Sequence, residues 1–400
     1  MSTFVNTFKA KLSEPLFLTE VLFKVYSFLT LMFVKEFFAE EQLQSFVFIL
    51  SVVLNSSTLC SVSYNFFVQE TLAKGKSLNH WNVFGGLFLI TLAILIYVKY
   101  YFNDLEIHLY FNNIYILFYL IFSNVLFLLS KNILNAFGMY KANLSLSLLF
   151  VLFNIINLAY TLLKGDLILY FMLNSFFMII FFVLSVIKSS VIKSCFVSID
   201  YLLLEEVRVL FKSLLKYFIP SLPAILPTSY LLYILKTPMW NESIIDWSIS
   251  QQIASVFMVL FSYKYIYAFN DYCKGEFIYQ NVLKDFKNAF KVIVGFGLMA
   301  VPISLYFDLS LWFVLIVIFS FPFQVFNGLL GVKYSILSGF FSLKLNLVWS
   351  LIFIIFITLF VYFENILFVA VGYCVSYIII SFYLFLLERE NFKKIKHFDF

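Results

Sequence analysis

The sequence predicts an all-α integral membrane protein, with about twelve transmembrane helices arranged as two six-helix halves around a central cavity. The first observation is composition: hydrophobic residues make up 63% of the 400 residues and charged residues 12%, whereas a soluble domain is about 45–50% apolar and about 25% charged. The second is aromatic content, because no soluble core of this length could hide 55 phenylalanines beside the other apolar side chains. The third is length: roughly 20 apolar residues span a bilayer, so a dozen spans use about 240 residues and leave short connections.

Apolar runs between charged or turn residues give the positions of the spans. The stretch that follows Pro15 is longer than a signal-peptide core and lacks a small-residue cleavage site, so we expect it to be the first span. The expected spans cover residues 16–34, 44–66, 82–98, 111–129, 143–162, 167–187, 217–235, 246–268, 287–306, 310–330, 344–362 and 365–387.

Positive charge alternates between the connections, and lysine or arginine near the end of a span is retained in the cytoplasm. The sequence therefore predicts a multi-pass protein whose N and C termini are both cytoplasmic. The connections expected outside are short and contain only Lys35, Lys99, Lys164 and Lys236. The inner segments contain many more basic residues, among them Lys74, Lys76, Lys131, Lys141, Lys188, Lys274 and Lys333.

A long central segment, 188–216, mixes charged with apolar residues, which is typical of an amphipathic helix on the inner membrane face. It predicts three regions: an N-terminal six-helix bundle at 1–190, an amphipathic cytoplasmic linker at 191–213, and a C-terminal six-helix bundle with a short cytoplasmic tail at 214–400.

The two halves resemble each other. Glu70 stands shortly before the pair Lys74-Gly75, and Asp271 stands shortly before Lys274-Gly275, each at the inner end of the second helix of its half. Parallel repeats of this kind are typical of secondary transporters.

Ionisable residues inside the hydrocarbon usually face a cavity or a partner. Glu20 and Lys24 in the first span are an i,i+4 pair with the acid first, the favourable order on a helix. They are either a neutralised pair that snorkels to the inner face or part of a cavity wall whose cation binds an anionic lipid head group. The same alternatives, snorkelling or a cavity position, apply to Lys264 in the eighth span.

Polar side chains mark the second and eighth spans. Asn55 and Ser56 begin a run of amides and hydroxyls in the second span, and Gln251 and Gln252 give the eighth span a similar polar point. Together with Lys24 and Lys264 they are the candidate substrate-binding residues of the cavity. The alternative is that they pack tightly on neighbouring helices or bond their own helix.

Three prolines, Pro220, Pro223 and Pro227, lie in the seventh span. Each removes a backbone donor and bends or breaks a helix, so this segment is a candidate hinge for alternating access. The alternative is a kink that only helps packing.

Motifs for other chemistry are missing from the sequence. It has no Walker A phosphate loop, no HExxH and no CxxC, so we expect neither an ATPase nor a hydrolase, and neither a metal nor another cofactor. The net charge of +5 is small and dispersed, which argues against nucleic acid as a partner.

The opening helix with Lys24, the segment Ser45–Gly75 with its closing Lys-Gly turn, and the segments Leu214–Pro220 and Ser248–Ala254 carry a resemblance over nearly the whole chain. The sequence resembles the Wzx-type O-antigen and polysaccharide flippases of the multidrug/oligosaccharidyl-lipid/polysaccharide (MOP) exporter superfamily, which have a MATE-like fold. It departs from them in having few acids and no arginine within its spans.

The resemblance implies transport of undecaprenyl-pyrophosphate-linked oligosaccharide units, of O-antigen or capsule type, across the bacterial inner membrane by alternating access. It also implies coupling to H⁺ or Na⁺, with Glu20, Glu70 and Asp271 as candidates. The implied partners are membrane lipids, a polysaccharide polymerase and chain-length proteins. Two alternatives are a MATE-like small-molecule antiporter and an integral-membrane polysaccharide polymerase or acyltransferase. The short outer connections argue against the polymerase.

Overall fold

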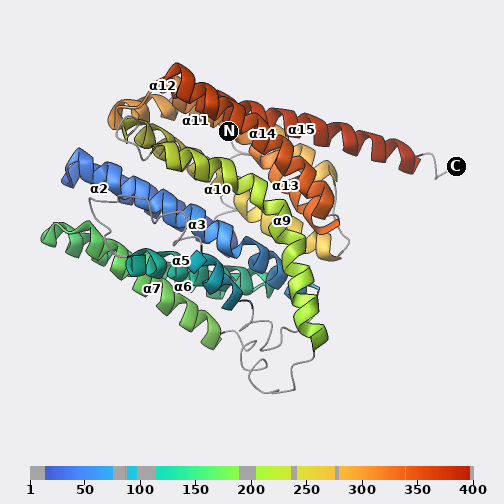
Figure 1. The fold of residues 1–400 in the computed structure, drawn as a ribbon, viewed down its shortest axis with the longest axis horizontal. Helices are drawn as coiled ribbons and strands as arrows, with labels where there is room; N and C mark the ends of the chain where they lie inside the picture. The colour runs from blue at the N-terminus through green and yellow to red at the C-terminus, as the bar shows by residue number, and fades with distance from the viewer. Residues whose placement is uncertain are drawn as a thin grey trace. The chain divides into compact units, whose positions relative to one another are not determined.

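The computed structural model describes residues 14–74, 86, 88–96, 114–188, 204–235, 241–274, 279–337 and 339–396 (Figure 1). Almost all of these residues are α-helical, as the sequence predicts. The chain divides into two compact units, Met1–Ser221 and Leu222–Phe400, called here the N-terminal and C-terminal units. Residues 191–203 of the predicted linker lie outside the described residues. Residues 204–213 form the first part of a helix that begins at Leu204.

Among its described residues, the N-terminal unit contains five long helices and a further helical stretch at 88–96. The long helices are α2 (Pro15–Phe37), α3 (Glu40–Ala73), α5 (Ile114–Ala136), α6 (Tyr140–Lys164) and α7 (Leu167–Lys188).

Helix α9 (Leu204–Leu235) begins in the N-terminal unit and ends in the C-terminal unit. The C-terminal unit continues with α10 (Asn241–Lys274), α11 (Tyr279–Phe307), α12 (Leu311–Phe319), α13 (Phe321–Leu337), α14 (Gly339–Phe363) and α15 (Leu367–Lys396).

Helices α12 and α13 are one interrupted span. The interruption falls at Ser320, and Pro322 follows in the first turn of α13, where its missing N–H is tolerated. With this pair taken as one, the described helices match the expected spans one for one. By length and composition alone, seven described segments can cross a membrane, whereas the apolar part of α9, Ile219–Leu235, is shorter.

Tight turns join the helices at the connections expected outside. Gly165 ends α6 with a φ of 68°, a left-handed conformation that glycine adopts without strain. Asp166 then caps α7, because its Oδ1 accepts a hydrogen bond of 2.9 Å from the backbone N–H of Ile168. Asn365 caps α15 in the same way, at 2.9 Å from the N–H of Leu367. Short polar caps are therefore enough to reverse the chain.

Large apolar side chains face outward along whole helix faces. On α11, Val294, Leu298 and Leu305 are each 78% exposed, and their spacing of about one or two turns places them on one side of the helix. Such a stripe would be unfavourable in water, but it fits the lipid tails that the composition requires.

Helix α5 is the central helix of the N-terminal unit, and α13 is the central helix of the C-terminal unit. Helix α5 packs mainly on α3 and α7, and α13 contacts α10, α11, α14 and α15. Around α5 a core of aromatic and aliphatic residues includes Phe127, Phe150 and Phe181, with the Phe127 and Phe181 ring centroids 4.9 Å apart. The central helices therefore hold each unit together.

Candidate functional site

A cluster of charged residues lies between the first helix and the central helix of the N-terminal unit. Lys131 Nζ on α5 donates a 3.0 Å hydrogen bond to Glu20 Oε1 on α2, and the two side chains are only 15% and 14% exposed. Lys24 is one turn after Glu20, and the charges of Glu20 and Lys131 both act on it. We call Glu20, Lys24 and Lys131 the α2–α5 cluster.

Aromatic packing fixes the position of this cluster. Phe23 stands beside Lys24 on α2 and packs edge-on against Phe127 of α5, with ring centroids 5.2 Å apart. It also contacts Phe150 of α6 at 5.7 Å. Lys131 Nζ lies 4.3 Å from the Phe23 ring centroid, which is a favourable cation–π distance. The Phe23 ring therefore helps to hold the Lys131 ammonium group next to Glu20.

Glu20 takes Lys131 as its partner rather than Lys24, the partner expected from the i,i+4 spacing. Within the described part of the chain, Lys24 forms no ion pair within 4.0 Å. The α2–α5 cluster thus has two cations and one anion in a partly buried, apolar setting. A cation without a counter-charge is energetically unfavourable in such a setting. The α2–α5 cluster is therefore suited to bind an anion.

Part of the polar run of α3 faces the interior of the N-terminal unit, whereas Thr58 of the same run is exposed. Ser57 is fully buried and donates to its own helix at Val53 O, and it lies 3.3 Å from Ile121 O of α5. Ser56 is also fully buried, and its Oγ has no hydrogen-bond partner. Asn55 is half-buried. Packing and bonding to the helix backbone explain part of this run, and Ser56 is left with unused hydrogen-bonding capacity.

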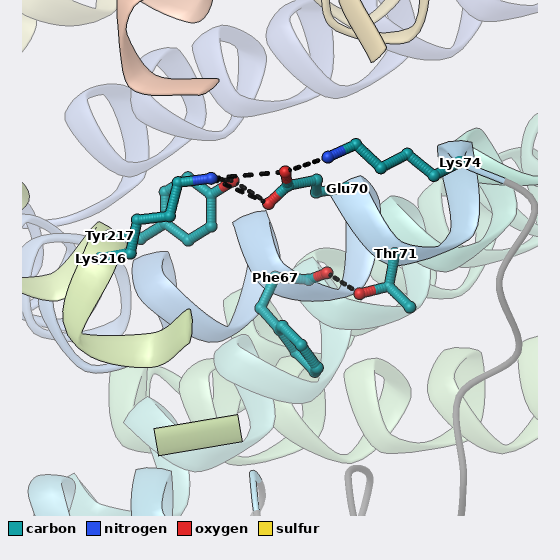
Figure 2. Close-up of polar contacts among 6 residues, drawn as sticks. All are labelled: Phe67, Glu70, Thr71, Lys74, Lys216 and Tyr217. Carbon is teal, nitrogen blue, oxygen red and sulfur yellow. Dashed lines mark hydrogen bonds and ion pairs between the residues drawn. The ribbon is translucent and has the colours of Figure 1, made fainter. Parts of the chain in front are cut away.

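A second cluster of charges surrounds Glu70 near the end of α3 (Figure 2). Lys74 Nζ lies 2.5 Å from Glu70 Oε1, and Lys216 Nζ of α9 lies 3.4 Å from both carboxylate oxygens. The Tyr217 hydroxyl donates to Glu70 Oε2. We call Glu70, Lys74, Lys216 and Tyr217 the Glu70 cluster; it joins the start of α9 to the end of α3 within the N-terminal unit.

The Glu70 cluster favours the ionised carboxylate. Burial alone would raise the pKa of Glu70, but the hydrogen bonds from Lys74 and Tyr217 and the charge of Lys216 outweigh it and lower the pKa below its ordinary value. A group that exchanges protons near neutral pH needs the opposite shift. The geometry therefore favours a structural contact over the predicted coupling role for Glu70.

The predicted residues of α10 lie at different places along that helix. Gln251 and Gln252 are half-buried near its start, and the Gln251 Oε1 accepts a 3.3 Å hydrogen bond from the Tyr373 hydroxyl of α15. Lys264 forms an ion pair with Asp285 of α11. Asp271 is half-buried in the last turn of α10.

Two buried acids were missed from the sequence, Asp285 and Glu388, which are 7% and 4% exposed. Glu388 of α15 accepts hydrogen bonds of 2.6 Å from both Lys333 Nζ and the Tyr334 hydroxyl of α13. Both acids fall just outside the expected spans, because hydropathy ends a span where charge begins, while α11 and α15 continue past those limits. One sequence feature could have indicated buried acids: Lys131 and Lys333 occupy similar positions near the ends of the two central helices, and a lysine there needs an acidic partner.

The predicted hinge is helical throughout. Helix α9 continues without interruption through Pro220, Pro223 and Pro227, which are all buried. The boundary between the two compact units falls between Ser221 and Leu222, within this proline-rich segment. The segment is therefore not unwound, although the chain passes from one unit to the other there.

No protein-family model and no curated protein sequence matches the chain. Solved structures do match it. A mutant of a Vibrio cholerae MATE transporter is 12% identical over 95% of each chain, with a TM-score of 0.69. An outward-facing multidrug resistance MATE family transporter of the MOP superfamily is 15% identical over 97% of this chain and 96% of its own, with a TM-score of 0.70.

A MOP superfamily transporter from Pyrococcus furiosus is also similar, with 14% identity over 97% of this chain and 96% of its own and a TM-score of 0.66. That structure is described as having a binding pocket of reverse polarity, which suggests a different function for it. At these identities the likeness concerns the fold. The chain has the fold of these MATE and MOP superfamily transporters.

Proposed function

We propose that the protein is a flippase that moves undecaprenyl-pyrophosphate-linked oligosaccharide units across the bacterial inner membrane, with both termini cytoplasmic. The observation that carries the proposal is the composition of the α2–α5 cluster, two lysines to one glutamate, in a transporter fold. A pyrophosphate is the anion that such a cluster would bind, because it brings several charge-assisted acceptors to Lys24 and Lys131.

The cluster also suggests how binding and ion movement are linked. A pyrophosphate would compete with Glu20 for Lys131, because both are anions that seek the same ammonium group. A carboxylate that loses its cation in a low-dielectric setting favours its protonated form. Glu20 is therefore our candidate for proton coupling, in preference to Glu70, which three donors already hold in its charged form.

A MATE-like small-molecule antiporter is the second candidate, because the structural neighbours include multidrug transporters. Transport of a cationic drug would call for an acid free to meet it. In the described residues discussed above, Glu20, Asp285 and Glu388 are each paired with a lysine. This pairing favours an anionic cargo over a cationic one.

Complementation of a deletion strain tests the proposed function. Lys24→Ala should abolish surface polysaccharide while the protein still accumulates in the membrane, and Lys24→Arg should retain part of the activity because it keeps the charge. Lys164→Ala is the matched control, since Lys164 is an exposed lysine of the same unit at the end of α6. Normal polysaccharide with Lys24→Ala, or drug sensitivity as the only phenotype of the deletion, would reject the proposal.

A further inference from the structure

Helices α6 and α7 form an antiparallel hairpin in the N-terminal unit and pack against each other (Figure 1). The start of α6 and the end of α7 therefore lie at the same end of the hairpin, opposite the tight turn at Gly165. Lys141 is the second residue of α6 and Lys188 is the last residue of α7, and both are exposed. Two different helices thus place a lysine at one end of the hairpin.

Ser145 of α6 brings these two lysines close to each other. It stands one turn after Lys141 on the same face of the helix, where neighbouring Cβ atoms are about 5–6 Å apart. Its hydroxyl donates to the carbonyl of Ala142 at 3.0 Å, and its Oγ accepts a 3.3 Å hydrogen bond from Lys188 Nζ. An ammonium group has three donors, so Lys188 keeps two of them for another acceptor.

No carboxylate neutralises this pair of lysines. Helices α6 and α7, described over their whole lengths, contain no acidic residue. Among all the described residues, neither Lys141 nor Lys188 forms an ion pair within 4.0 Å, whereas Lys74, Lys131 and Lys333 near the ends of other helices each pair with a glutamate. Like charges held close together repel, and an anion between them removes that repulsion. The two lysines are therefore complementary to an anionic group.

An exposed apolar surface continues from the lysines along the hairpin. Leu149 and Phe153 follow Ser145 at intervals of four residues, so they share its face of α6, and they are 38% and 37% exposed. The Phe153 ring stacks on Phe177 of α7, with ring centroids 5.1 Å apart. From Ser145 to Phe153 the helix rises about 12 Å, which is most of the roughly 15 Å that one leaflet contributes to the hydrocarbon core. We call the following residues the α6–α7 surface: Lys141, Ser145, Leu149, Phe153, Phe177 and Lys188.

A ligand with an anionic head and an apolar chain matches both parts of the α6–α7 surface. A soluble anion would use the lysines alone, and a lipid without net charge would leave them without a counter-charge. Anionic phospholipids give the cytoplasmic leaflet its negative potential, and clustered lysines at the membrane surface attract them.

We propose that the α6–α7 surface binds one anionic phospholipid. Its phosphate lies between Lys141 and Lys188, and one acyl chain follows Leu149 and Phe153. The leaflet is the cytoplasmic one in the proposed orientation of the chain. The site goes beyond the proposed transport, because the phospholipid is a component of the membrane and not the cargo, and its charged contacts are separate from Lys24 and the rest of the α2–α5 cluster.

Native mass spectrometry of the full-length protein in detergent micelles tests the site. The probes are dioleoyl phosphatidylglycerol, dioleoyl phosphatidylcholine and inorganic phosphate. Each lysine near an anionic lipid contributes about a fivefold gain in affinity. Lys141→Gln and Lys188→Gln should therefore each raise the Kd for phosphatidylglycerol about fivefold, and the double variant about 25-fold. Lys164→Gln, at an exposed lysine at the other end of α6, should equal the wild type.

Three results would overturn the inference. They are equal affinities for phosphatidylglycerol and phosphatidylcholine, a double variant that binds phosphatidylglycerol as tightly as the wild type, and displacement of this lipid by an equal concentration of inorganic phosphate, which indicates a site for free phosphate. The substituted lysines are exposed, and monodisperse elution with unchanged circular dichroism establishes that the variants are folded.

A variant of the α2–α5 cluster separates this site from the proposed cargo site. Lys24→Ala should leave the affinity for phosphatidylglycerol unchanged. A loss of binding in Lys24→Ala would place the phospholipid at the α2–α5 cluster and overturn the inference. If phosphatidylglycerol binds as expected and Lys24→Ala complements fully, the phospholipid site stands and the proposed flippase function fails; if Lys24→Ala abolishes surface polysaccharide and the double variant binds like the wild type, the reverse holds.

Discussion

The central helix of each unit carries a half-buried lysine near its end, but the two lysines have different surroundings. In the N-terminal unit, Lys131 of α5 pairs with Glu20 of α2, and Lys24 is left as a second cation. In the C-terminal unit, Lys333 of α13 pairs with Glu388 of α15, and the Tyr334 hydroxyl donates a second hydrogen bond to the Glu388 carboxylate. Lys333 is matched by one carboxylate, whereas the α2–α5 cluster contains two cations and one carboxylate.

The ion pair in the C-terminal unit is therefore expected to contribute to stability, and the α2–α5 cluster in the N-terminal unit to ligand binding. In a neutral ion pair each charge already has its counter-charge, so the pair does not need a ligand. Removing one partner leaves the other charge buried without compensation, which destabilises the fold. A group with surplus positive charge is less favourable by itself and gains from an anion. The comparison predicts that lysine substitutions affect mainly folding in the C-terminal unit and mainly transport in the N-terminal unit.

The largest effect on stability is expected at Lys333. Lys333→Met leaves the carboxylate of Glu388, which is 4% exposed, without its cation, and should lower the free energy of unfolding by about 3 kcal/mol. Chemical unfolding in detergent measures it. The double variant Lys333→Met with Glu388→Met should recover most of the loss, since apolar side chains of similar volume replace the pair. A loss below about 1 kcal/mol in the single variant would show that the pair is not effectively buried.

A smaller effect is expected at the Glu70 cluster. Tyr217→Phe removes a hydrogen bond to a carboxylate, which contributes about 1.5–3 kcal/mol at neutral pH. Tyr362→Phe, at a tyrosine that is 79% exposed, is the control. Thermal unfolding of both variants beside the wild type gives the difference.

The same contact predicts a dependence on pH. Because the pKa of Glu70 is lowered in the folded protein, its stabilising contribution is complete above the unfolded value of about 4.3 and is lost as the pH falls through the lower folded value. The stability difference between wild type and Tyr217→Phe should therefore shrink below pH of about 4. A difference that is constant across this range would mean that Tyr217 acts through packing alone, for example through its stacking on Phe66.

The smallest effect on stability is expected at Lys24. Lys24→Met leaves the Glu20–Lys131 pair neutral, so the free energy of unfolding should change by less than about 1 kcal/mol or rise slightly. Surface polysaccharide should nevertheless be lost. Destabilisation as large as that of Lys333→Met would remove the distinction between the two lysines.

The all-helical fold in two halves was predictable from the sequence, because every expected span overlaps a helical segment of the described residues. The two compact units meet between Ser221 and Leu222, within α9, which runs from the end of the predicted linker into the seventh span. The domain limits expected around 190–214 stay a prediction. Hydropathy detects where lipid contact begins but carries no information on how far a helix continues beyond it.

The charged partners were less predictable than the helices. Lys131 stands just after an expected span and was assigned to a connection, yet α5 continues to Ala136 and brings this lysine against Glu20. Glu388 and Asp285 were hidden in the same way, because charge ends a hydropathy window. A pair such as Lys333 and Glu388 joins helices distant in sequence, and only tertiary packing brings such residues together.

We propose that Lys24 and Lys131 bind the pyrophosphate of the cargo, and the affinity for undecaprenyl pyrophosphate in lipid nanodiscs tests this claim. Undecaprenyl pyrophosphate is titrated into the wild type, Lys24→Gln and Lys164→Gln. Loss of one charge-assisted contact predicts a Kd at least about tenfold higher for Lys24→Gln, with Lys164→Gln equal to the wild type. Equal affinities of all three proteins would contradict the claim.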